Sequence, residues 1–275
     1  MKNIMNECFL SFFILLCSMI SSCNATAGAI ITNFHRSDST VTATVAAWTE
    51  PEGIPNPCYG WSSCYVGPDV DYAGHGIGGL YGSCNAGGCL AIENLKTTAD
   101  VARGYKKQHL LPFTYTFHII DFYNSTTCAG MVFIKEPSLD SHAHAEPFPG
   151  SACTTVPPDN YQCSLTIPPY IDHGVLGAES LNGNSMTVIG KIKCNYSGQM
   201  TISTISDSGD NIVHLKGDSL ISTITVNEKN AKDGLILKTM KNQTVDVRIK
   251  STLTSDGTVT SGSYKGNVLM YVNYS

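Results

Sequence analysis

The sequence predicts an all-β protein with two β-sandwich-like domains, and three observations lead to this prediction. Gly, Thr, Ser, Val and Tyr are plentiful, whereas long helix-forming runs are absent. Near the C-terminus, Val268, Met270, Val272 and Tyr274 recur at every second position, which is the period of a β-strand. A polar stretch with two prolines, residues 154–160, has the composition of a stiff linker between domains.

The first 27 residues have the features of a secretory signal peptide. Lys2 precedes an apolar run at 9–20 that is too short to span a bilayer, and Ala25-Thr26-Ala27 is a small-residue cleavage site. We therefore expect export to the periplasm and a mature chain that begins at Gly28. The alternative is a lipoprotein, because the residues that end at Cys23 are similar to a lipobox.

The cysteine content of the mature chain agrees with export. An even number of cysteines in an exported protein predicts disulfides, here up to four, but sequence alone leaves their pairing open. No C-x-x-C occurs, which disfavours a zinc ribbon. The cysteine pairs closest in sequence are Cys84 with Cys89 and Cys58 with Cys64. Cys163 and Cys194 are well placed to join two early strands of the second domain. The remaining two are Cys128 and Cys153.

The two predicted domains, residues 28–157 and 158–275, differ in charge. The first carries six Lys/Arg and eleven Asp/Glu, a net charge of −5, and the second carries ten of each. Nucleic acids and anionic membranes require a basic surface, so we expect the first domain to bind neither. Removal of 27 residues from 275 leaves 248, which is enough for two small domains.

The C-terminal residues resemble the signature of chaperone–usher pilus subunits. Gly262 is fourteenth from the end, and Tyr274 is a penultimate aromatic residue. The resemblance implies that 268–274 is the last strand of an incomplete immunoglobulin-like pilin domain. A periplasmic chaperone would pair with this strand during export to the outer-membrane usher, and an adjacent subunit would later donate the missing strand. Apolar groups occur on both faces of this strand, which predicts burial on both sides. The alternative is an ordinary closing strand of a sandwich.

Further strands are expected in the second domain near 163–167, 190–194, 200–205, 221–226, 235–238 and 244–251. Turn pairs such as Asn182-Gly183 and Asp256-Gly257 separate them. A sandwich with one strand missing has an open groove. We expect His173 and His214 to be ordinary surface or turn residues.

Subunits within a pilus carry an N-terminal extension that they donate as a strand to the neighbouring subunit. In this chain a whole domain stands in the place of that extension. Residues 28–34 and 40–47 already have a strand pattern, so no free extension follows Ala27, and we expect a tip position. The plan is similar to fimbrial tip adhesins of the MrpH type from the Proteus group. The glycine-rich segment around His75, the strand with His118, and the pair Cys128 and Cys153 carry this resemblance. It implies a receptor-binding domain that holds zinc through three histidines and supports adhesion and biofilm formation.

The chemistry of two histidines fits a metal site independently of the resemblance. His118 lies on the more polar face of a strand at 113–120, unlike a core histidine. His75 lies among glycines at 72–79, which let the backbone adopt unusual conformations. A histidine on a rigid strand opposite one on such a loop is a plausible start for a zinc site.

The third metal ligand stays open in the sequence. The family motif has a His-x-His, and Ala73 stands where its first histidine is expected. The candidates are Asp71 and the pair His142 and His144, whose i, i+2 spacing points both rings the same way in an extended chain. The alternative for the pair is a polar surface loop. An open zinc position could coordinate an acidic group or a hydroxyl of a host glycan or glycoprotein receptor.

Three classes of function remain, and we rank a tip adhesin first. A non-adhesive minor pilus subunit is second, and a secreted metal-dependent hydrolase is a distant third. No H-E-x-x-H and no G-x-S-x-G occurs, which disfavours an enzyme. Six aromatic residues close to the candidate metal segments could stack on sugars, although we expect most to be core residues: Trp48, Tyr59, Trp61, Tyr65, Tyr72 and Tyr81.

Overall fold

The structure is a computed structural model. It describes residues 28–275 apart from 51, 73–74, 120–125, 141, 152–153, 157–159, 207–208, 233 and 275. The predicted signal peptide, 1–27, with its alternative processing sites at Ala27 and Cys23, lies outside the described residues, as do Ala73 and Cys153.

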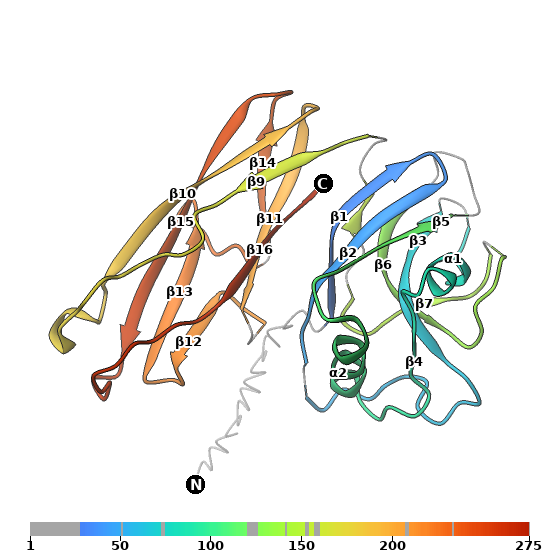
Figure 1. The fold of residues 1–275 in the computed structure, drawn as a ribbon, viewed down its shortest axis with the longest axis horizontal. Helices are drawn as coiled ribbons and strands as arrows, with labels where there is room; N and C mark the ends of the chain where they lie inside the picture. Colours follow the sequence, from blue (N-terminus) through green and yellow to red (C-terminus); the bar gives the residue numbers. More distant parts are fainter. Residues whose placement is uncertain are drawn as a thin grey trace, which may run out of the picture.

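The first domain is built from two antiparallel sheets with two helices beside them (Figure 1). One sheet has the order β1-β2-β5, and the other has the order β4-β3-β6-β7, with β8 also paired to β6. The elements are β1 (Ala29–Ser37), β2 (Thr40–Trp48), β3 (Tyr65–Tyr72), α1 (Tyr81–Asn85), β4 (Leu90–Ala91), α2 (Thr98–His109), β5 (Phe113–His118), β6 (Thr126–Ile134), β7 (Glu146–Pro147) and β8 (Thr154–Thr155).

Alternating side chains of the strands form the core of this domain. Val41, Ala43 and Val45 of β2 are buried at every second position, and Tyr115 and Phe117 of β5 lie next to them in the same core. Helix α2 adds Tyr105, whose ring centroid lies 4.9 Å from that of Trp48. The composition did not indicate this twelve-residue helix, which begins at a capping box formed by Thr97 and Asp100.

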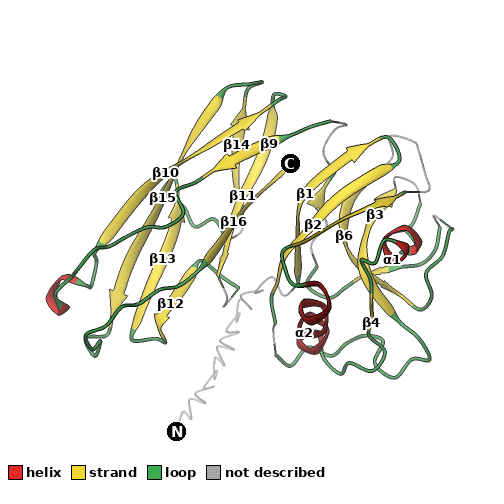
Figure 2. Ribbon diagram, in the orientation of Figure 1, coloured by secondary structure: helices red, strands yellow, loops and turns green. Residues whose placement is uncertain are grey.

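The second domain is a sandwich of a five-stranded and a three-stranded antiparallel sheet, seen as two yellow layers in Figure 2. The orders are β12-β13-β15-β10-β9 and β14-β11-β16. The elements are β9 (Cys163–Thr166), the 3₁₀ helix η1 (Ala178–Ser180), β10 (Ser185–Cys194), β11 (Gly198–Ser206), β12 (Ile212–Lys216), β13 (Leu220–Val226), β14 (Leu235–Thr239), β15 (Thr244–Ser255) and β16 (Val268–Tyr274). The all-β prediction is confirmed, although β12 was not foreseen.

Strand β16 has only one neighbour in its sheet within the described part of the chain. It pairs with β11 from Val268↔Ser206 to Tyr274↔Met200, and it ends the sheet order. All seven of its residues are half-buried. The sequence predicted a strand buried on both faces, and the difference arises because, among the described residues, no further strand pairs with the second edge of β16.

Three disulfides join described cysteines: Cys58–Cys64, Cys84–Cys89 and Cys163–Cys194. The last links β9 to β10 where the two cysteines are direct cross-strand partners, as the sequence suggested. Cys128 is also disulfide-bonded. Every cysteine that the structure describes in the mature chain is therefore oxidised to a disulfide.

The predicted linker begins later than expected. Thr154 and Thr155 form β8 and pair with Ala129 and Cys128 of β6, so they belong to the first domain. Backbone pairing outweighs the polar composition of this stretch. Among the described residues, no helix has the length and apolar character needed to cross a membrane.

Candidate functional site

The glycine-rich segment after β3 folds back on that strand as a tight turn. The His75 amide donates to the Tyr72 carbonyl at 3.0 Å, Asp71 pairs with Ile77, and the Gly78 amide donates to the Val70 carbonyl at 3.3 Å. His75 is thereby held, exposed, at the tip of a turn that extends the end of β3.

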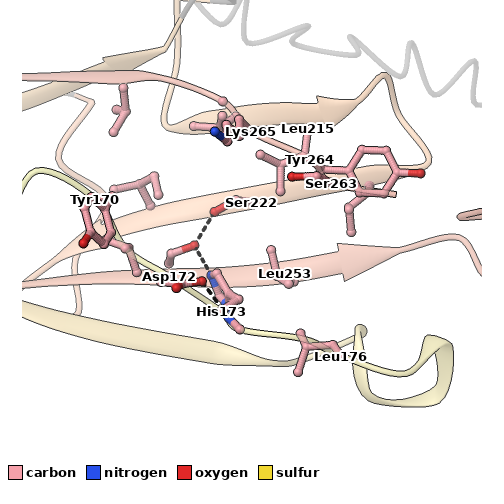
Figure 3. A pocket seen from close by; sticks show the side chains of 18 of the residues that line it. Tyr170, Asp172, His173, Leu176, Leu215, Ser222, Leu253, Ser263, Tyr264 and Lys265 are labelled. Carbon is pink, nitrogen blue, oxygen red and sulfur yellow. Dashed lines mark hydrogen bonds between the residues drawn. The ribbon is translucent and has the colours of Figure 1, made fainter. Parts of the chain in front are cut away.

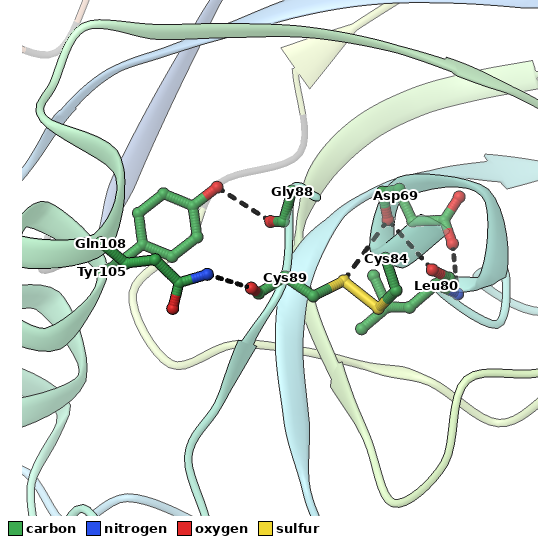
Figure 4. The surroundings of a disulfide bond; sticks show 8 residues. Asp69, Leu80, Cys84, Gly88, Cys89, Tyr105 and Gln108 are labelled. Atoms are coloured by element: carbon green, nitrogen blue, oxygen red, sulfur yellow. Dashed lines mark hydrogen bonds between the residues drawn. A yellow bond between two sulfur atoms is a disulfide. The ribbon is translucent and has the colours of Figure 1, made fainter. Parts of the chain in front are cut away.

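A buried carboxylate fixes the far end of this turn (Figure 4). The Asp69 carboxylate accepts hydrogen bonds from the backbone amide of Val70 at 2.8 Å and from the backbone amide of Leu80 at 2.7 Å. Leu80 is fully buried and has a left-handed backbone with φ of 61°, which a non-glycine residue adopts only when its surroundings enforce it. Burial raises the pKa of Asp69 to about 6.

The turn packs closely against the segment that follows β6. The Ser138 amide donates to the Gly79 carbonyl at 2.7 Å, and a side chain at Gly79 would collide with the Ser138 backbone. A side chain at Gly76 would meet the Ala143 carbonyl. Of these two glycines, only Gly79 requires the absence of a side chain for the two backbones to approach, since a side chain at Gly76 would be in ordinary contact; residues 142–145 lie next to His75.

This approach places His142 beside His75. Nδ1 of His75 lies 2.9 Å from Nε2 and 3.2 Å from Nδ1 of His142, and the ring centroids are 4.3 Å apart. Both side chains are exposed. The two imidazoles come from segments 67 residues apart in the chain.

His118 lies on the exposed face of β5, as its strand pattern predicts. Its Nδ1 lies 3.3 Å from Oγ1 of Thr40 on β2. Its backbone carbonyl lies directly against Gly82 in α1, where a side chain could not fit. His118 thus borders the other end of the glycine-rich segment.

The remaining candidate ligands are dispersed. His144 is exposed in the loop that carries His142, and Asp71 directs Oδ2 toward the sulfur of Cys128 at 4.0 Å. Within the described ranges, no three His, Cys, Asp or Glu side chains gather closely enough to hold a metal ion.

The His75 and His142 pair fits zinc, whereas the full triad implied by the family resemblance is not assembled among these residues. Two nitrogens bound to one tetrahedral zinc at about 2.0–2.1 Å lie about 3.3 Å from each other. The 2.9 and 3.2 Å separations between the two rings are close to this value. His142 was predicted only as a possible third ligand, and the zinc site stays a prediction.

The six aromatic residues near these segments divide into two buried, three exposed and one half-buried, Tyr65. Trp48 and Tyr72 are core residues, as expected of most of them. Tyr59, Trp61 and Tyr81 are exposed by 51%, 43% and 40%. Exposure of half of the six aromatic residues is more than the sequence led us to expect.

The second domain contains a groove of about 1010 Å³ (Figure 3). One wall is the segment that follows β9, residues 167–178, and the other is the segment that leads into β16, residues 259–268. Its floor is mainly apolar, with Val213, Leu220, Ile224, Ile249 and Leu253 from β12, β13 and β15, and it also includes Ser222 and Ser251. Of the predicted donor-strand contacts, Gly262, Val268 and Met270 line the groove, and Val272 and Tyr274 pack on the adjoining core.

A chain of hydrogen bonds ties one wall of the groove to its floor. Nδ1 of His173 lies 2.7 Å from Oδ1 of Asn184, and Nε2 lies 2.7 Å from Oγ of Ser251. Ser251 in turn contacts Ser222 at 2.6 Å. His173 lies in the loop after β9, as predicted for a surface or turn residue, but it is half-buried because Asn184 and, from β15, Ser251 contact both of its ring nitrogens. His214 is exposed and lies 3.1 Å from Asp218, as predicted for a surface residue.

Family models match both halves of the chain. The fimbrial adhesin MrpH N-terminal domain matches residues 29–160, and the fimbrial adhesin MrpH C-terminal domain matches residues 163–275. Both halves are thus those of a fimbrial adhesin, a binding protein of the bacterial surface rather than an enzyme. The chain belongs to the MrpH family, as its resemblance predicted.

Among solved structures, the chain is similar to a complex of the archaic chaperone–usher Csu pili of Acinetobacter baumannii, the CsuC–CsuE chaperone–tip adhesion subunit pre-assembly complex. The identity is 9%, the TM-score is 0.31, and the match covers 81% of this chain and 88% of that chain. No curated protein matches the chain.

The buried Asp69 generates a testable pH dependence. Its pKa is about 6 in the folded protein and ordinarily 3.8, so the folded state holds the proton more tightly than the unfolded state. The free energy of unfolding should therefore fall by an amount on the order of 3 kcal/mol as pH rises from about 4 to about 6. Above about pH 6 this contribution should not change further. We expect Asp69→Asn to abolish this contribution.

Both tryptophans lie in the first domain, so urea unfolding followed by tryptophan fluorescence reports on that domain alone. Between pH 4 and pH 7, the unfolding free energy of the parent should fall relative to that of Asp69→Asn. Parallel pH profiles for the two proteins would contradict the assignment.

Proposed function

We propose that this protein is the tip adhesin of a chaperone–usher pilus, exported through the periplasm and displayed at the cell surface. The first domain attaches to a host glycan or glycoprotein and promotes biofilm formation, and the second domain anchors the subunit. The observation that carries the anchoring role is the groove between the segment after β9 and the segment before β16, whose mainly apolar floor is open to solvent.

Backbone hydrogen bonding supports a strand as the occupant of the groove. β9 and β16 both end their sheet orders in the described structure, so each presents one edge on which a further strand can pair. A strand inserted between them would pair its backbone and cover the floor with alternate side chains. A periplasmic chaperone supplies such a strand first, and the adjacent pilus subunit supplies it after passage through the usher.

Zinc is the second part of the proposal. His75 and His142 would hold the ion through ring nitrogens, and His118, His144 or Asp71 would supply a further ligand. Bound zinc provides a Lewis acid with a coordination position that an acidic or hydroxyl group of a receptor can occupy. The His75 and His142 rings, exposed at adjoining turns, leave this side of the site open to a receptor.

Met270 provides a test of the groove. It lines the groove from β16, and a carboxylate buried there without a partner costs several kcal/mol. We expect Met270→Glu to lower the yield of the chaperone complex by about tenfold or more, since each 1.4 kcal/mol is a factor of ten. The measurement is co-purification of the full chain with its cognate chaperone from the periplasm.

Asn273→Ser is the matched control, because Asn273 lies on the same strand with the opposite facing. It should pair with the chaperone as the parent does. Undiminished pairing and piliation by Met270→Glu would count against the groove as the docking site.

Elemental analysis of the full mature chain, purified without a chelating tag, tests the metal site. We expect about one zinc per chain. The zinc should be lost in His75→Ala and in His142→Ala, because removal of either ring leaves too few protein ligands to hold the ion. His118→Ala, His144→Ala and Asp71→Ala identify the further ligand.

His214→Ala is the control, since His214 is an exposed histidine of the other domain. A parent chain without zinc, or zinc retained after both His75 and His142 are replaced, would refute this part of the proposal.

A further inference from the structure

The loop that precedes β3 presents two aromatic side chains to solvent. Tyr59 is 51% exposed and Trp61 is 43% exposed, and both lie within residues 56–64. These are the large hydrophobic side chains that the described part of this loop exposes, and the exposed Pro57 lies beside them in the chain. A ligand that covers an exposed tryptophan gains binding free energy, because a large apolar surface is removed from water.

The backbone of this loop is held rigidly from below. The Cys58–Cys64 disulfide closes the loop, and both cysteines are fully buried. The buried Asn56 donates its amide to the carbonyls of Ile92 and Leu95, each at 2.8 Å, and accepts from the Cys58 amide at 3.3 Å. A rigid loop loses little conformational entropy when a ligand binds to it.

Trp61 is positioned as a platform. Its ring lies 6.3 Å from the buried ring of Phe133, centroid to centroid, and its amide donates to the Cys58 carbonyl at 3.1 Å. One side of the indole is therefore supported by the core while the rest is open to solvent. Such a ring offers its face for stacking without a change of rotamer.

Polar groups flank the two aromatic rings. The Gly60 amide, between Tyr59 and Trp61, donates to the Glu93 carbonyl at 2.8 Å, which fixes Glu93 next to the loop. The Glu93 carboxylate accepts from the Asn94 side-chain amide at 3.1 Å, and this pair is exposed. An aromatic face beside a carboxylate and an amide matches the chemistry of a sugar, which has an apolar C–H face and hydroxyl groups at its edge.

We propose that residues 56–64 and the Glu93–Asn94 pair form a glycan-binding site for uncharged sugars. The proposal deepens the adhesin function and rests on it. Trp61 and Tyr59 stack on the apolar face of a pyranose ring, and Glu93 and Asn94 bond its hydroxyls. The sugar is uncharged because Glu93 and the first domain's excess of acidic residues, eleven against six basic ones, repel an anionic one.

This site is separate from the His75 and His142 pair. The aromatic loop leads into β3 at Tyr65, and the turn with His75 follows its other end at Tyr72. An eight-residue strand spans about 23 Å between its ends, given a rise of about 3.3 Å per residue. Zinc content and sugar binding can therefore be measured independently of one another.

The experiment uses the full chain in complex with its cognate chaperone on an array of neutral and sialylated oligosaccharides. We expect binding to neutral oligosaccharides, with affinity lowered about tenfold or more by Trp61→Ala and restored in part by Trp61→Phe, which keeps a ring. Soluble sugar should also protect Trp61 from quenching by the uncharged quencher acrylamide, since Trp48 is buried and contributes little to the accessible signal.

Tyr196→Ala is the control, because Tyr196 is an aromatic residue of similar exposure, 44%, in the second domain. It should bind as the parent does. No binding to neutral oligosaccharides, a preference for sialylated ones, or equal binding by the parent and Trp61→Ala would overturn the proposal. Recovery of the chaperone complex in the same preparation tests the adhesin assembly separately, so failure of either claim is distinguishable.

Discussion

The unsatisfied edges of the second domain are the constraint on which the rest of this protein depends. A sandwich becomes stable when its two sheets cover a common core and when strand edges are paired or protected. Here β9 and β16 each end a sheet, and the core residues beneath them line a groove of about 1010 Å³. An apolar surface of this kind favours association, which is why we propose a partner strand as the occupant of the groove.

The first domain solves a different problem, the support of exposed side chains on a rigid frame. Strand β3 connects the aromatic loop at one end with the His75 turn at the other. Buried polar groups fix both ends: Asn56 below the aromatic loop, and Asp69 below the turn. Each of them satisfies backbone groups that a tight loop leaves without regular partners, and this explains why polar residues occur within an otherwise apolar core.

Periodic features could be predicted from the sequence, and features made by distant residues could not. The strand at Val268–Tyr274 and the Cys163–Cys194 link follow from alternation and strand order. The proximity of His142 to His75 goes with close backbone packing of Gly79 on Ser138, which no local pattern reveals. Helix α2 was missed because a short capping box starts it in a β-rich composition, and the role of His173 was missed because Ser251 lies 78 residues away.

Hydrogen–deuterium exchange of the full chain tests the central claim, that a partner strand completes the second domain. Exchange should be compared between the free chain and its complex with the cognate chaperone, by peptide mass spectrometry. The account predicts strong protection of 268–274 and 163–176 in the complex, with β13 and β15 changed less because both their edges are already paired. Equal exchange of these two segments in the free and bound chain would contradict it.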